Sequence, residues 1–315
     1  MVKEIHLKIG GEDCLAELPD RGKSIYIVGA DTYYGAHLAL HWRQHGYTVS
    51  GCGATAALRP EIFTRYEVTD YSALPLPEAK FAWIFYCHDA HDGFAEHLRG
   101  VQTLGDTLLK RQREYKIAYL SSGAIYESSA KPLRENARIQ PHNQYELAAA
   151  TAENCLQECC FQSGGKILPY ILRCGDIYGS EFGQSSAYGL IGRYLTAARA
   201  GQPLLIPGLG NTSRSLLHVA DACEAAIKIL TMDFPPQCVN LPGEKRMIIE
   251  LALAIADKYH IEADMGANST ELREMLDDEF SPYAGHRSLS SAFFRKCVDF
   301  VPVHKFDTWL KSIPA

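Results

Sequence analysis

Short apolar segments alternate with longer helical segments from residue 24 onward, and this alternation constrains the fold more than any other feature of the chain. Residues 24–30 (SIYIVGA) predict a strand, residues 35–46 (GAHLALHWRQHG) a helix, and residues 47–53 (YTVSGCG) a second strand. Strands that alternate with helices form a parallel sheet covered on both faces. The sequence therefore predicts an α/β fold with a Rossmann-type, doubly wound parallel sheet. Later buried strands are predicted at 81–89, 116–126 and 166–179.

The chain is predicted to contain three parts. Residues 1–22 alternate apolar and polar side chains around a Gly-Gly turn, which is the pattern of an N-terminal β-hairpin extension. Residues 23–179 hold the regular alternation of strands and helices. From 180 to 315 this alternation loosens into helices separated by Gly and Pro turns, which predicts a smaller C-terminal lobe.

Composition narrows the possible partners and surroundings of the chain. A net charge of -6 gives no sign of an extended basic surface, so we expect neither nucleic acid nor an anionic membrane as a partner. The sequence has no apolar run near the ~20 residues that span a bilayer, and its start lacks the apolar core of a secretion signal. A cytoplasmic location is therefore expected. The ten cysteines show no CxxC spacing, so they are interpreted as thiols rather than as a disulfide framework or zinc site.

The first strand and helix carry a nucleotide-binding pattern. Gly29 stands at the end of the strand and Gly35 at the start of the helix. A turn of this kind aims backbone N–H groups and the positive end of the helix dipole at a phosphate. Two glycines six residues apart also occur in tight turns that only pack a strand against a helix. The position at the start of an alternating β/α chain favours the nucleotide interpretation.

Six segments, found in order and in register, resemble the extended short-chain dehydrogenase/reductase family, the group of sugar-nucleotide epimerases and dehydratases. The resemblance runs from about Ser24 to the C-terminus. It implies that residues 23–179 form a dinucleotide-binding domain and that 180–315 form a substrate-binding lobe. It also implies NAD or NADP as cofactor, a small-molecule substrate held between the lobes, and a homodimer. The segments are 66–74 (YEVTDYSAL), 119–127 (YLSSGAIYE), 141–153 (PHNQYELAAATAE), 172–179 (LRCGDIYG), 190–226 and 239–256.

The resemblance also implies the reaction centre. In the family a Ser orients the substrate hydroxyl and a Tyr exchanges its proton, while hydride moves between the sugar carbon and the nicotinamide. On this sequence the Ser position is Ser122 and the Tyr position is Tyr145. The positions that match cofactor contacts are Gly29, Thr32, Gly35, Glu67 and His88, and those that match contacts to the substrate diphosphate are Asp176 and Arg214.

The largest departure from the family lies four residues after the Tyr, on the same face of the predicted helix. The family has a Lys there, which lowers the pKa of the tyrosine and holds the nicotinamide ribose, whereas this chain has Ala149. Tyr145 would then lack the cation that makes proton exchange favourable near neutral pH. His88, which would titrate near physiological pH, is a candidate for a substitute base.

Other ligand-facing positions also differ from the family. Thr32 replaces the middle glycine of the phosphate loop, where a β-branched side chain is expected to crowd the ligand. The second strand ends at Gly53 instead of the usual acid, so the choice between NAD and NADP stays open. His88 and Asp89 occupy positions of small residues, and Asp176 replaces an Asn that contacts the substrate diphosphate.

Simpler interpretations accompany several of these residues. Ser122 fits an ordinary turn at the end of a strand, Tyr145 fits a helix residue kept for packing, and Arg214 fits a surface cation. The run CHDAHD around His88 resembles a metal-binding cluster, but residues this close in a loop seldom face one point and no further ligand is apparent. The sequence is therefore interpreted as having no metal site.

The leading hypothesis is a divergent NAD(P)-binding epimerase, dehydratase or reductase that acts on a nucleotide sugar or related hydroxylated substrate. It would use an altered relay through Ser122 and Tyr145 that lacks the Lys. One alternative is a catalytically impaired pseudoenzyme that uses the fold for binding or sensing. Another is a cofactor-independent lyase or isomerase that uses His88 and Asp89.

Overall fold

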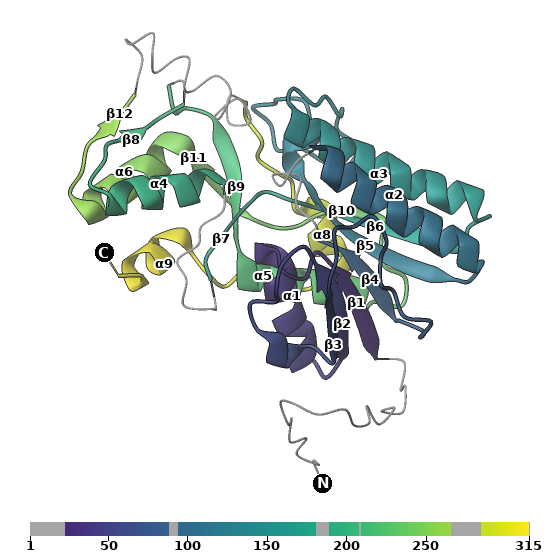
Figure 1. Ribbon diagram of the computed structural model, residues 1–315. Coiled ribbons are helices and arrows are strands. Elements are labelled where there is room, and N and C mark those ends of the chain that lie inside the picture. The colour runs from purple at the N-terminus through teal and green to yellow at the C-terminus, as the bar shows by residue number, and fades with distance from the viewer. Residues whose placement is uncertain (1–22, 88–93, 181–188, 208, 266–284, 315) are drawn as a thin grey trace.

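The described residues form a larger lobe around a parallel sheet and a smaller lobe beside it (Figure 1). The computed structural model describes residues 23–314 apart from 88–93, 181–188, 208 and 266–284. The predicted hairpin at 1–22 and the residues His88 and Asp89 therefore lie outside the described part of the chain.

The sheet of the larger lobe has seven parallel strands in the described part of the chain, in the order β10-β6-β5-β4-β1-β2-β3. The order runs outward in both directions from β1 and β4. In open α/β sheets the crevice outside the carboxyl ends of the strands at such a switch point is where ligands bind. The strands are β1 Ser24–Val28, β2 Thr48–Gly53, β3 Arg65–Val68, β4 Trp83–Tyr86, β5 Tyr115–Ser122, β6 Ile167–Cys174 and β10 Cys238–Asn240.

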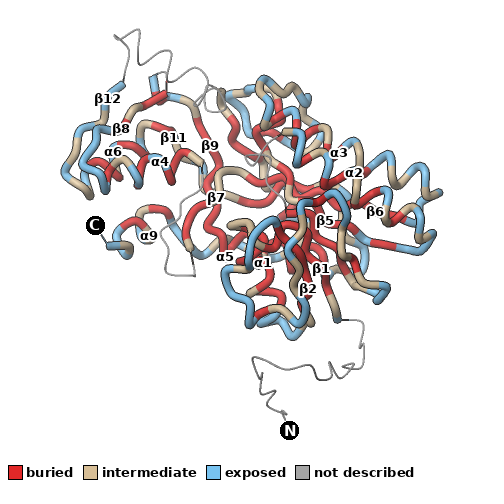
Figure 2. The backbone as a smooth tube through the Cα atoms, in the orientation of Figure 1, coloured by how far each residue is buried: buried red, intermediate tan, exposed pale blue. Residues whose placement is uncertain are grey.

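Helices cover both faces of this sheet because successive strand residues point to opposite faces. Ile25 and Ile27 of β1 pack into a core shared with α1, α5 and α8, whereas Tyr26 and Val28 pack into a second core shared with α2 and α3. Figure 2 shows most of these strands buried, whereas the edge strand β3 is exposed or half-buried. The predicted doubly wound fold is confirmed. The helices are α1 Tyr33–Gln44, α2 Phe94–Arg111, α3 Gln144–Gln162, α5 Val219–Leu230 and α8 Ala292–Cys297.

The smaller lobe has its own apolar core, which includes Leu195, Leu216, Ile255 and Phe306. Its three-stranded sheet has the order β11-β9-β7, and β8 pairs with β12. The elements are β7 Asp176–Tyr178, α4 Gly189–Arg199, β8 Leu204–Leu205, β9 Ser213–His218, β11 Glu244–Met247, α6 Ile248–Tyr259, β12 Ala263–Asp264 and α9 Phe306–Ser312.

The chain passes between the lobes more than once. Helices α5 and α8 and strand β10 follow residue 179 in the sequence, yet they belong to the larger lobe. Residues 285–290 run along the seam between the lobes, where the N–H of Arg287 donates to Ser213 of β9 and the N–H of Leu133 donates to Ser288. This segment therefore fastens the smaller lobe to the loop that follows β5.

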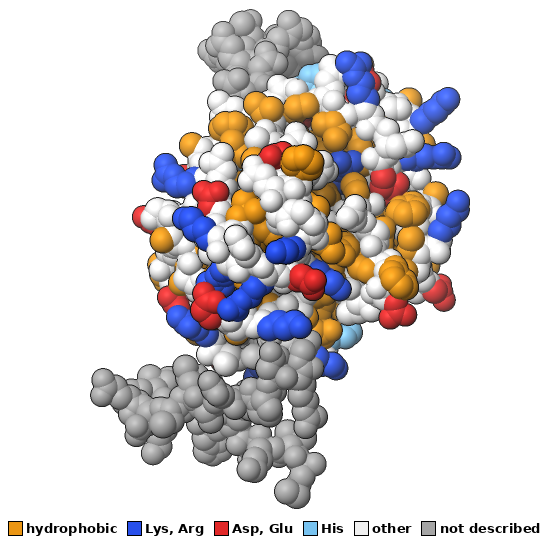
Figure 3. Space-filling view, turned by 90° about the vertical axis from the view of Figure 1, so that its right-hand side faces the viewer, with side chains coloured by type: hydrophobic (Ala, Val, Ile, Leu, Met, Phe, Trp, Pro, Cys, Tyr) orange, Lys and Arg blue, Asp and Glu red, His pale blue; other side chains and the backbone are white. Residues whose placement is uncertain are grey.

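Both signs of charge appear on the side of the molecule where α2 and α3 lie in Figure 1. Figure 3 shows Lys, Arg, Asp and Glu interspersed with hydrophobic side chains on that face. Among the described residues, no helix combines the length and the apolar character that a membrane crossing needs.

Candidate functional site

The turn after β1 has the geometry of a phosphate-binding loop. Gly29 has φ of 80°, a left-handed conformation that favours glycine, and its N–H donates to Cys52 of β2. A Cβ on Gly35 would stand 2.1 Å from the carbonyl oxygen of Gly29, so only glycine fits where the first turn of α1 crosses β1. The loop thus places the N-terminus of α1 at the carboxyl edge of the sheet, next to the switch point.

Thr32 caps α1 and stabilises this loop. Its hydroxyl oxygen accepts from the N–H of Gly35 at 3.1 Å and lies 2.7 Å from the carbonyl oxygen of Gly29. It also lies 3.0 Å from the carbonyl oxygen of Cys87, just after β4. The hydroxyl of Thr32, which stands where the family has a glycine, therefore points into the turn. It also connects the loop to the residue that follows β4.

A carboxylate stands at the end of β2, although that strand ends in Gly53. Asp31 of the phosphate loop accepts through Oδ2 from the N–H and hydroxyl of Thr55 at 2.8 and 3.0 Å. Its Oδ1 would lie 2.1 Å from a Cβ on Gly53, so a side chain there would displace the carboxylate. Oδ1 is buried and has no hydrogen-bond partner among the described residues. Burial, with Asp31 adding to it, raises the pKa of Tyr66 on the neighbouring strand.

Ser122 is the last residue of β5, at the carboxyl edge of the sheet, and is half-buried. It caps the short 3₁₀ helix η3 (Gly123–Ile125), because its Oγ accepts from the N–H of Ala124 at 3.1 Å. The turn role that the sequence allowed for Ser122 is therefore present. A hydroxyl that accepts one hydrogen bond keeps its own proton to donate, so capping is compatible with a contact to substrate.

Tyr145 stands in the first turn of α3 and is half-buried. Asn143 caps the helix by accepting from the N–H of Glu146 at 2.9 Å, while Glu146 accepts from the N–H of His142 at 2.7 Å. Ala149, one turn after Tyr145, is 3% exposed and packs with Ile125 of η3. The turn that carries Tyr145 therefore lies beside the turn that Ser122 caps, and apolar packing occupies the position of the family's Lys.

A buried ion pair fixes α3 against the sheet. Glu153 of α3 accepts from Nε and Nη2 of Arg173 on β6 at 2.9 and 2.6 Å, and also from the hydroxyl of Ser121 on β5. Glu153 and Arg173 are 2% and 5% exposed. Two parallel hydrogen bonds between ionised groups hold a defined geometry. They stabilise the position of α3 relative to β5, and therefore that of Tyr145 relative to Ser122.

The two residues predicted to contact the substrate diphosphate contact each other. Nε and Nη2 of Arg214 on β9 donate to the two carboxylate oxygens of Asp176 on β7 at 2.8 and 2.9 Å. Arg214 is 4% exposed, so it is not a surface cation. A carboxylate paired in this way neutralises the positive charge that would attract a phosphate.

The remaining predicted residues are separate from this centre. Glu67 lies on β3 at the edge of the sheet and pairs with Arg65 on the same strand. His88 and the rest of the 88–92 cluster lie outside the described residues. A search of the described residues alone shows no group of three or more His, Cys, Asp or Glu arranged to hold a metal ion.

Sequence reasoning missed Asp31 and Arg287. The sequence did contain a signal for Asp31. The second strand lacks an acid at its end, Gly53, and the phosphate loop contains one. Arg287 belongs to none of the matched segments. It is 4% exposed, and its Nε donates at 3.1 Å to the carbonyl oxygen of Ala124, in the turn that Ser122 caps.

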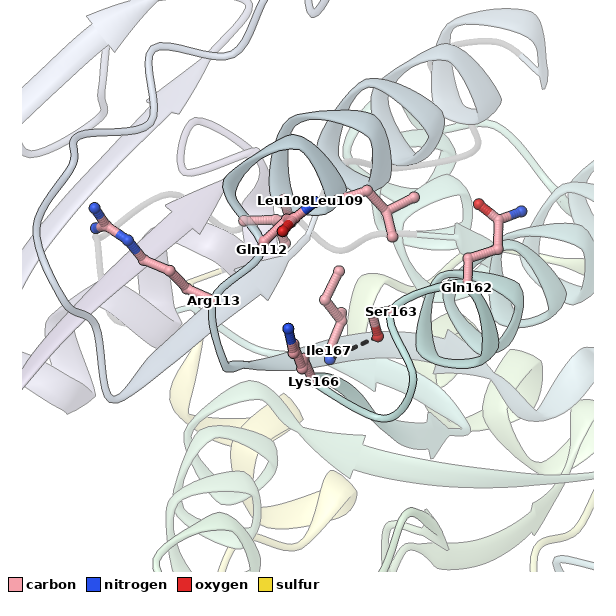
Figure 4. Close-up of a pocket in the computed structure, with 8 residues that line it drawn as sticks. All are labelled: Leu108, Leu109, Gln112, Arg113, Gln162, Ser163, Lys166 and Ile167. Carbon is pink, nitrogen blue, oxygen red and sulfur yellow. Dashed lines mark hydrogen bonds between the residues drawn. The ribbon is translucent and has the colours of Figure 1, made fainter.

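A shallow pocket of about 210 Å³ lies at the opposite edge of the sheet (Figure 4). It is formed where α2 and α3 end and where β5 and β6 begin, and the N–H of Ile167 donates there to Ser163 at 3.0 Å. Ser122 stands at the carboxyl end of β5, so this pocket is separate from the candidate site. Its lining residues are Leu108, Leu109, Gln112, Arg113, Gln162, Ser163, Lys166 and Ile167.

Comparisons with known proteins identify the family of this chain and agree with its fold. A sequence model of the NAD-dependent epimerase/dehydratase family matches residues 25–241. A dTDP-4-dehydro-6-deoxy-D-allose reductase from a Streptomyces species is 26% identical over 265 residues, which cover 73% of this chain and 79% of the reductase.

Solved structures share the fold at lower identity. MoeE5 in complex with UDP-glucose and NAD superposes with a TM-score of 0.74 at 18% identity, covering 92% of this chain and 96% of MoeE5. MoeE5 has also been solved with UDP-glucuronic acid and NAD. The UDP-glucose 4-epimerase of Thermus thermophilus, in complex with NAD, has a TM-score of 0.69 at 18% identity, with 91% and 96% coverage. The family match spans more than half of the chain, and the chain belongs to the NAD-dependent epimerase/dehydratase family.

Proposed function

We propose that this protein binds NAD at the carboxyl edge of the larger sheet and acts on a nucleotide-linked sugar as an epimerase, dehydratase or reductase. The observation that supports this most is the packing of α3 against η3, which places the turn of Tyr145 beside the turn of Ser122. Both turns lie at the same edge of the sheet as the phosphate loop. A phosphate site and a proton-transfer pair at one edge suit a hydride-transfer enzyme.

The loop residues fit the adenosine half of a dinucleotide. Gly29 and Gly35 keep the turn tight enough for backbone N–H groups to face a pyrophosphate. The orphaned Oδ1 of Asp31 stands at the end of β2, where a carboxylate accepts from ribose hydroxyls. The same negative charge repels the 2′-phosphate of NADP. We therefore expect NAD to be preferred over NADP.

Ala149 offers the nicotinamide ribose no ammonium group, whereas the family that the sequence resembles has a Lys at this position. Bound NAD would supply the hydride acceptor or donor. Ser122 would orient the substrate hydroxyl with its free proton, and Tyr145 would exchange the proton of that hydroxyl. Ala149 provides no ammonium group to stabilise the tyrosinate, so we expect proton exchange to be slow at neutral pH and to accelerate as the pH rises.

The substrate class follows from the relatives and from the smaller lobe. The reductase relative acts on a dTDP-linked sugar, and MoeE5 binds UDP-linked sugars. In this chain the diphosphate of such a substrate would compete with Asp176 for Arg214. We therefore propose a nucleotide sugar whose diphosphate is held less firmly by Arg214 than in relatives that have an Asn at this position.

A second candidate is a protein that binds a nucleotide ligand without turning it over. The Asp176–Arg214 pair and the apolar packing of Ala149 favour it, because both weaken functions that an enzyme of this family needs. The cofactor-independent lyase rested on His88 and Asp89, which lie outside the described residues. A homodimer and a cytoplasmic location remain predictions from the resemblance and the composition.

Calorimetry with NAD⁺ and NADP⁺, followed by turnover assays on UDP- and dTDP-linked sugars, tests the proposal. We expect NAD to bind more tightly than NADP and turnover to fall in Tyr145→Phe. Absence of binding by either dinucleotide at millimolar concentration would overturn the proposal. Dinucleotide binding without turnover, unaffected by Tyr145→Phe, would establish the second candidate instead.

A further inference from the structure

Arg287 is a buried arginine at the seam between the lobes, beside the candidate reaction centre. The segment that carries it, 285–290, passes between the lobes (Figure 1). The backbone of Arg287 forms a bridge with Arg214 of β9 and donates to the carbonyl oxygen of Ser213 at 2.7 Å. These contacts fix the backbone from which the side chain extends. The residue is 4% exposed.

The guanidinium group uses only part of its hydrogen-bonding capacity. Nε donates to the carbonyl oxygen of Ala124 at 3.1 Å and Nη1 donates to that of His286 at 3.3 Å. A guanidinium has five N–H donors, so three have no acceptor among the described residues. A Cβ on Gly285 would stand 2.3 Å from Nη1, which shows that the chain leaves room for this group.

The positive charge of Arg287 has no carboxylate paired with it in the described part of the chain. Arg214 is neutralised by Asp176, but the contacts of Arg287 are carbonyl oxygens. Burial lowers the pKa of Arg287, Arg214 lowers it further, and the nearby carboxyl of Glu146 opposes both. The carboxyl of Glu146 accepts from the N–H of His142 and forms no ion pair with Arg287 in the described part of the chain. An arginine stays protonated at neutral pH, so its charge persists.

We propose that Arg287 binds an oxyanion of the substrate, either a carboxylate on the sugar or a phosphate of the nucleotide. This proposal rests on the proposed function, because it names a chemical group of that same substrate. The planar guanidinium matches both groups through paired N–H donors. An anion at this position supplies the counter-charge and the acceptors that the protein itself leaves out.

The place of Arg287 supports a contact close to the reacting part of the substrate. Ala124 connects the two side chains, because its N–H donates to Ser122 and its carbonyl oxygen accepts from Arg287. The guanidinium and the hydroxyl of Ser122 thus flank one residue at the carboxyl edge of the sheet. An anionic substituent bound by Arg287 would lie near the hydroxyl that Ser122 orients.

The test measures ligand affinity by calorimetry on the full chain saturated with NAD. The ligands are UDP, UDP-glucose and UDP-glucuronic acid, and the last two differ only in the sugar carboxylate. The variants are Arg287→Gln, which removes the charge, and Arg287→Lys, which keeps the charge but loses the planar fork. We expect Arg287→Gln to lower the affinity for the ligand that carries the bound oxyanion at least tenfold, and Arg287→Lys to have an intermediate affinity.

The pattern across ligands identifies the anion. A loss confined to UDP-glucuronic acid assigns the sugar carboxylate, and an equal loss for all three assigns the diphosphate. Unchanged affinity for all three ligands in both variants would overturn the proposal. A parallel loss of NAD affinity and thermal stability, with no ligand-specific change in Arg287→Lys, would also overturn it in favour of a structural role.

Failure of the proposed function gives a different result. If the wild-type chain binds none of the three ligands in the presence of NAD, the assignment of a UDP-linked substrate is wrong, whatever the Arg287 variants do. If the wild type binds all three and the variants bind equally well, the proposed function stands and only the role of Arg287 falls.

Discussion

Replacing Asp176 by Asn restores the family's residue at this position and separates the Asp176–Arg214 pair. In the structure the two carboxylate oxygens accept from Nε and Nη2 of Arg214 at 2.8 and 2.9 Å. The Asp176 side chain is 20% exposed and that of Arg214 is 5% exposed, so the arginine is the more deeply desolvated partner. The amide keeps one acceptor for Arg214 but removes the compensating charge.

The substitution has two expected effects of opposite sign. Removing one partner of a buried ion pair costs about 3–5 kcal/mol; because Asp176 is partly exposed and Asn still accepts one hydrogen bond, we expect a loss of about 1–3 kcal/mol. The Arg214 donor that Asp176 held then becomes available to a diphosphate. A hydrogen bond to a charged group contributes about 1.5–3 kcal/mol, which corresponds to roughly 10- to 100-fold tighter binding of UDP.

The assay combines thermal unfolding with calorimetric titration of UDP at low ionic strength. Asp176→Asn should unfold at a lower temperature than wild type without ligand, and saturating UDP should recover much of the difference. Glu78→Gln is the control, because it also turns a carboxylate beside arginines into an amide but lies at the surface next to Arg111 and Arg113. Equal UDP affinity in Asp176→Asn and wild type would refute the view that Asp176 masks the phosphate-binding charge.

Four other changes test the rest of the site. Asp31→Asn should weaken NAD binding by about 10-fold and narrow the difference between NAD and NADP in calorimetry, since it removes a charged acceptor. Ala149→Lys must bury a long side chain at a residue that is 3% exposed, so it should lower the free energy of unfolding by about 1–3 kcal/mol in a thermal melt. It should also strengthen NAD binding and speed turnover at neutral pH. Unchanged kinetics would show that the absence of the Lys does not limit activity. Thr32→Val should lose about 1 kcal/mol in urea unfolding, and Thr32→Ser should retain most of it. Burial raises the pKa of Glu146, so the folded state holds that proton more tightly than the unfolded state does, and the protein loses stability as the pH rises from the unfolded pKa through the folded pKa. The stability of Glu146→Gln relative to wild type should therefore increase between acidic and neutral pH. A stability difference that does not change with pH would contradict this.

The inner part of the central sheet was predictable because strands such as β1 are buried along most of their length and therefore read as apolar runs. Ile25 to Val28 face two separate cores, so each of these four positions is apolar. Strand β10 has only three residues, Cys238–Asn240, and a segment so short has no periodicity to recognise. Its place at the edge of the larger sheet depends on pairing with β6, which no local pattern contains.

The site was predictable to the extent that its residues lie in contiguous motifs. Ser122 and Tyr145 could be predicted as candidates because each stands inside a recognisable segment at the end of a strand or the start of a helix. The contact of Asp176 with Arg214 joins residues 38 positions apart, and that of Arg287 with Ala124 joins residues 163 apart. Such pairings depend on how the lobes assemble, so the spacing of residues in the sequence does not predict them.

The charges at the candidate site indicate why a bound ligand should matter for the stability of this protein. Ala149 provides no cation, Asp176 neutralises the charge of Arg214, and Arg287 is buried with carbonyl oxygens rather than a carboxylate as its hydrogen-bond acceptors. A buried charge without an ionised partner costs several kcal/mol, and an apolar residue of similar volume avoids that cost. A chain that used this fold only as a scaffold would gain stability from such a replacement. Retaining Arg287 is therefore easier to explain if an anion binds there, since a ligand that binds only the folded state adds stability that increases with the logarithm of its affinity.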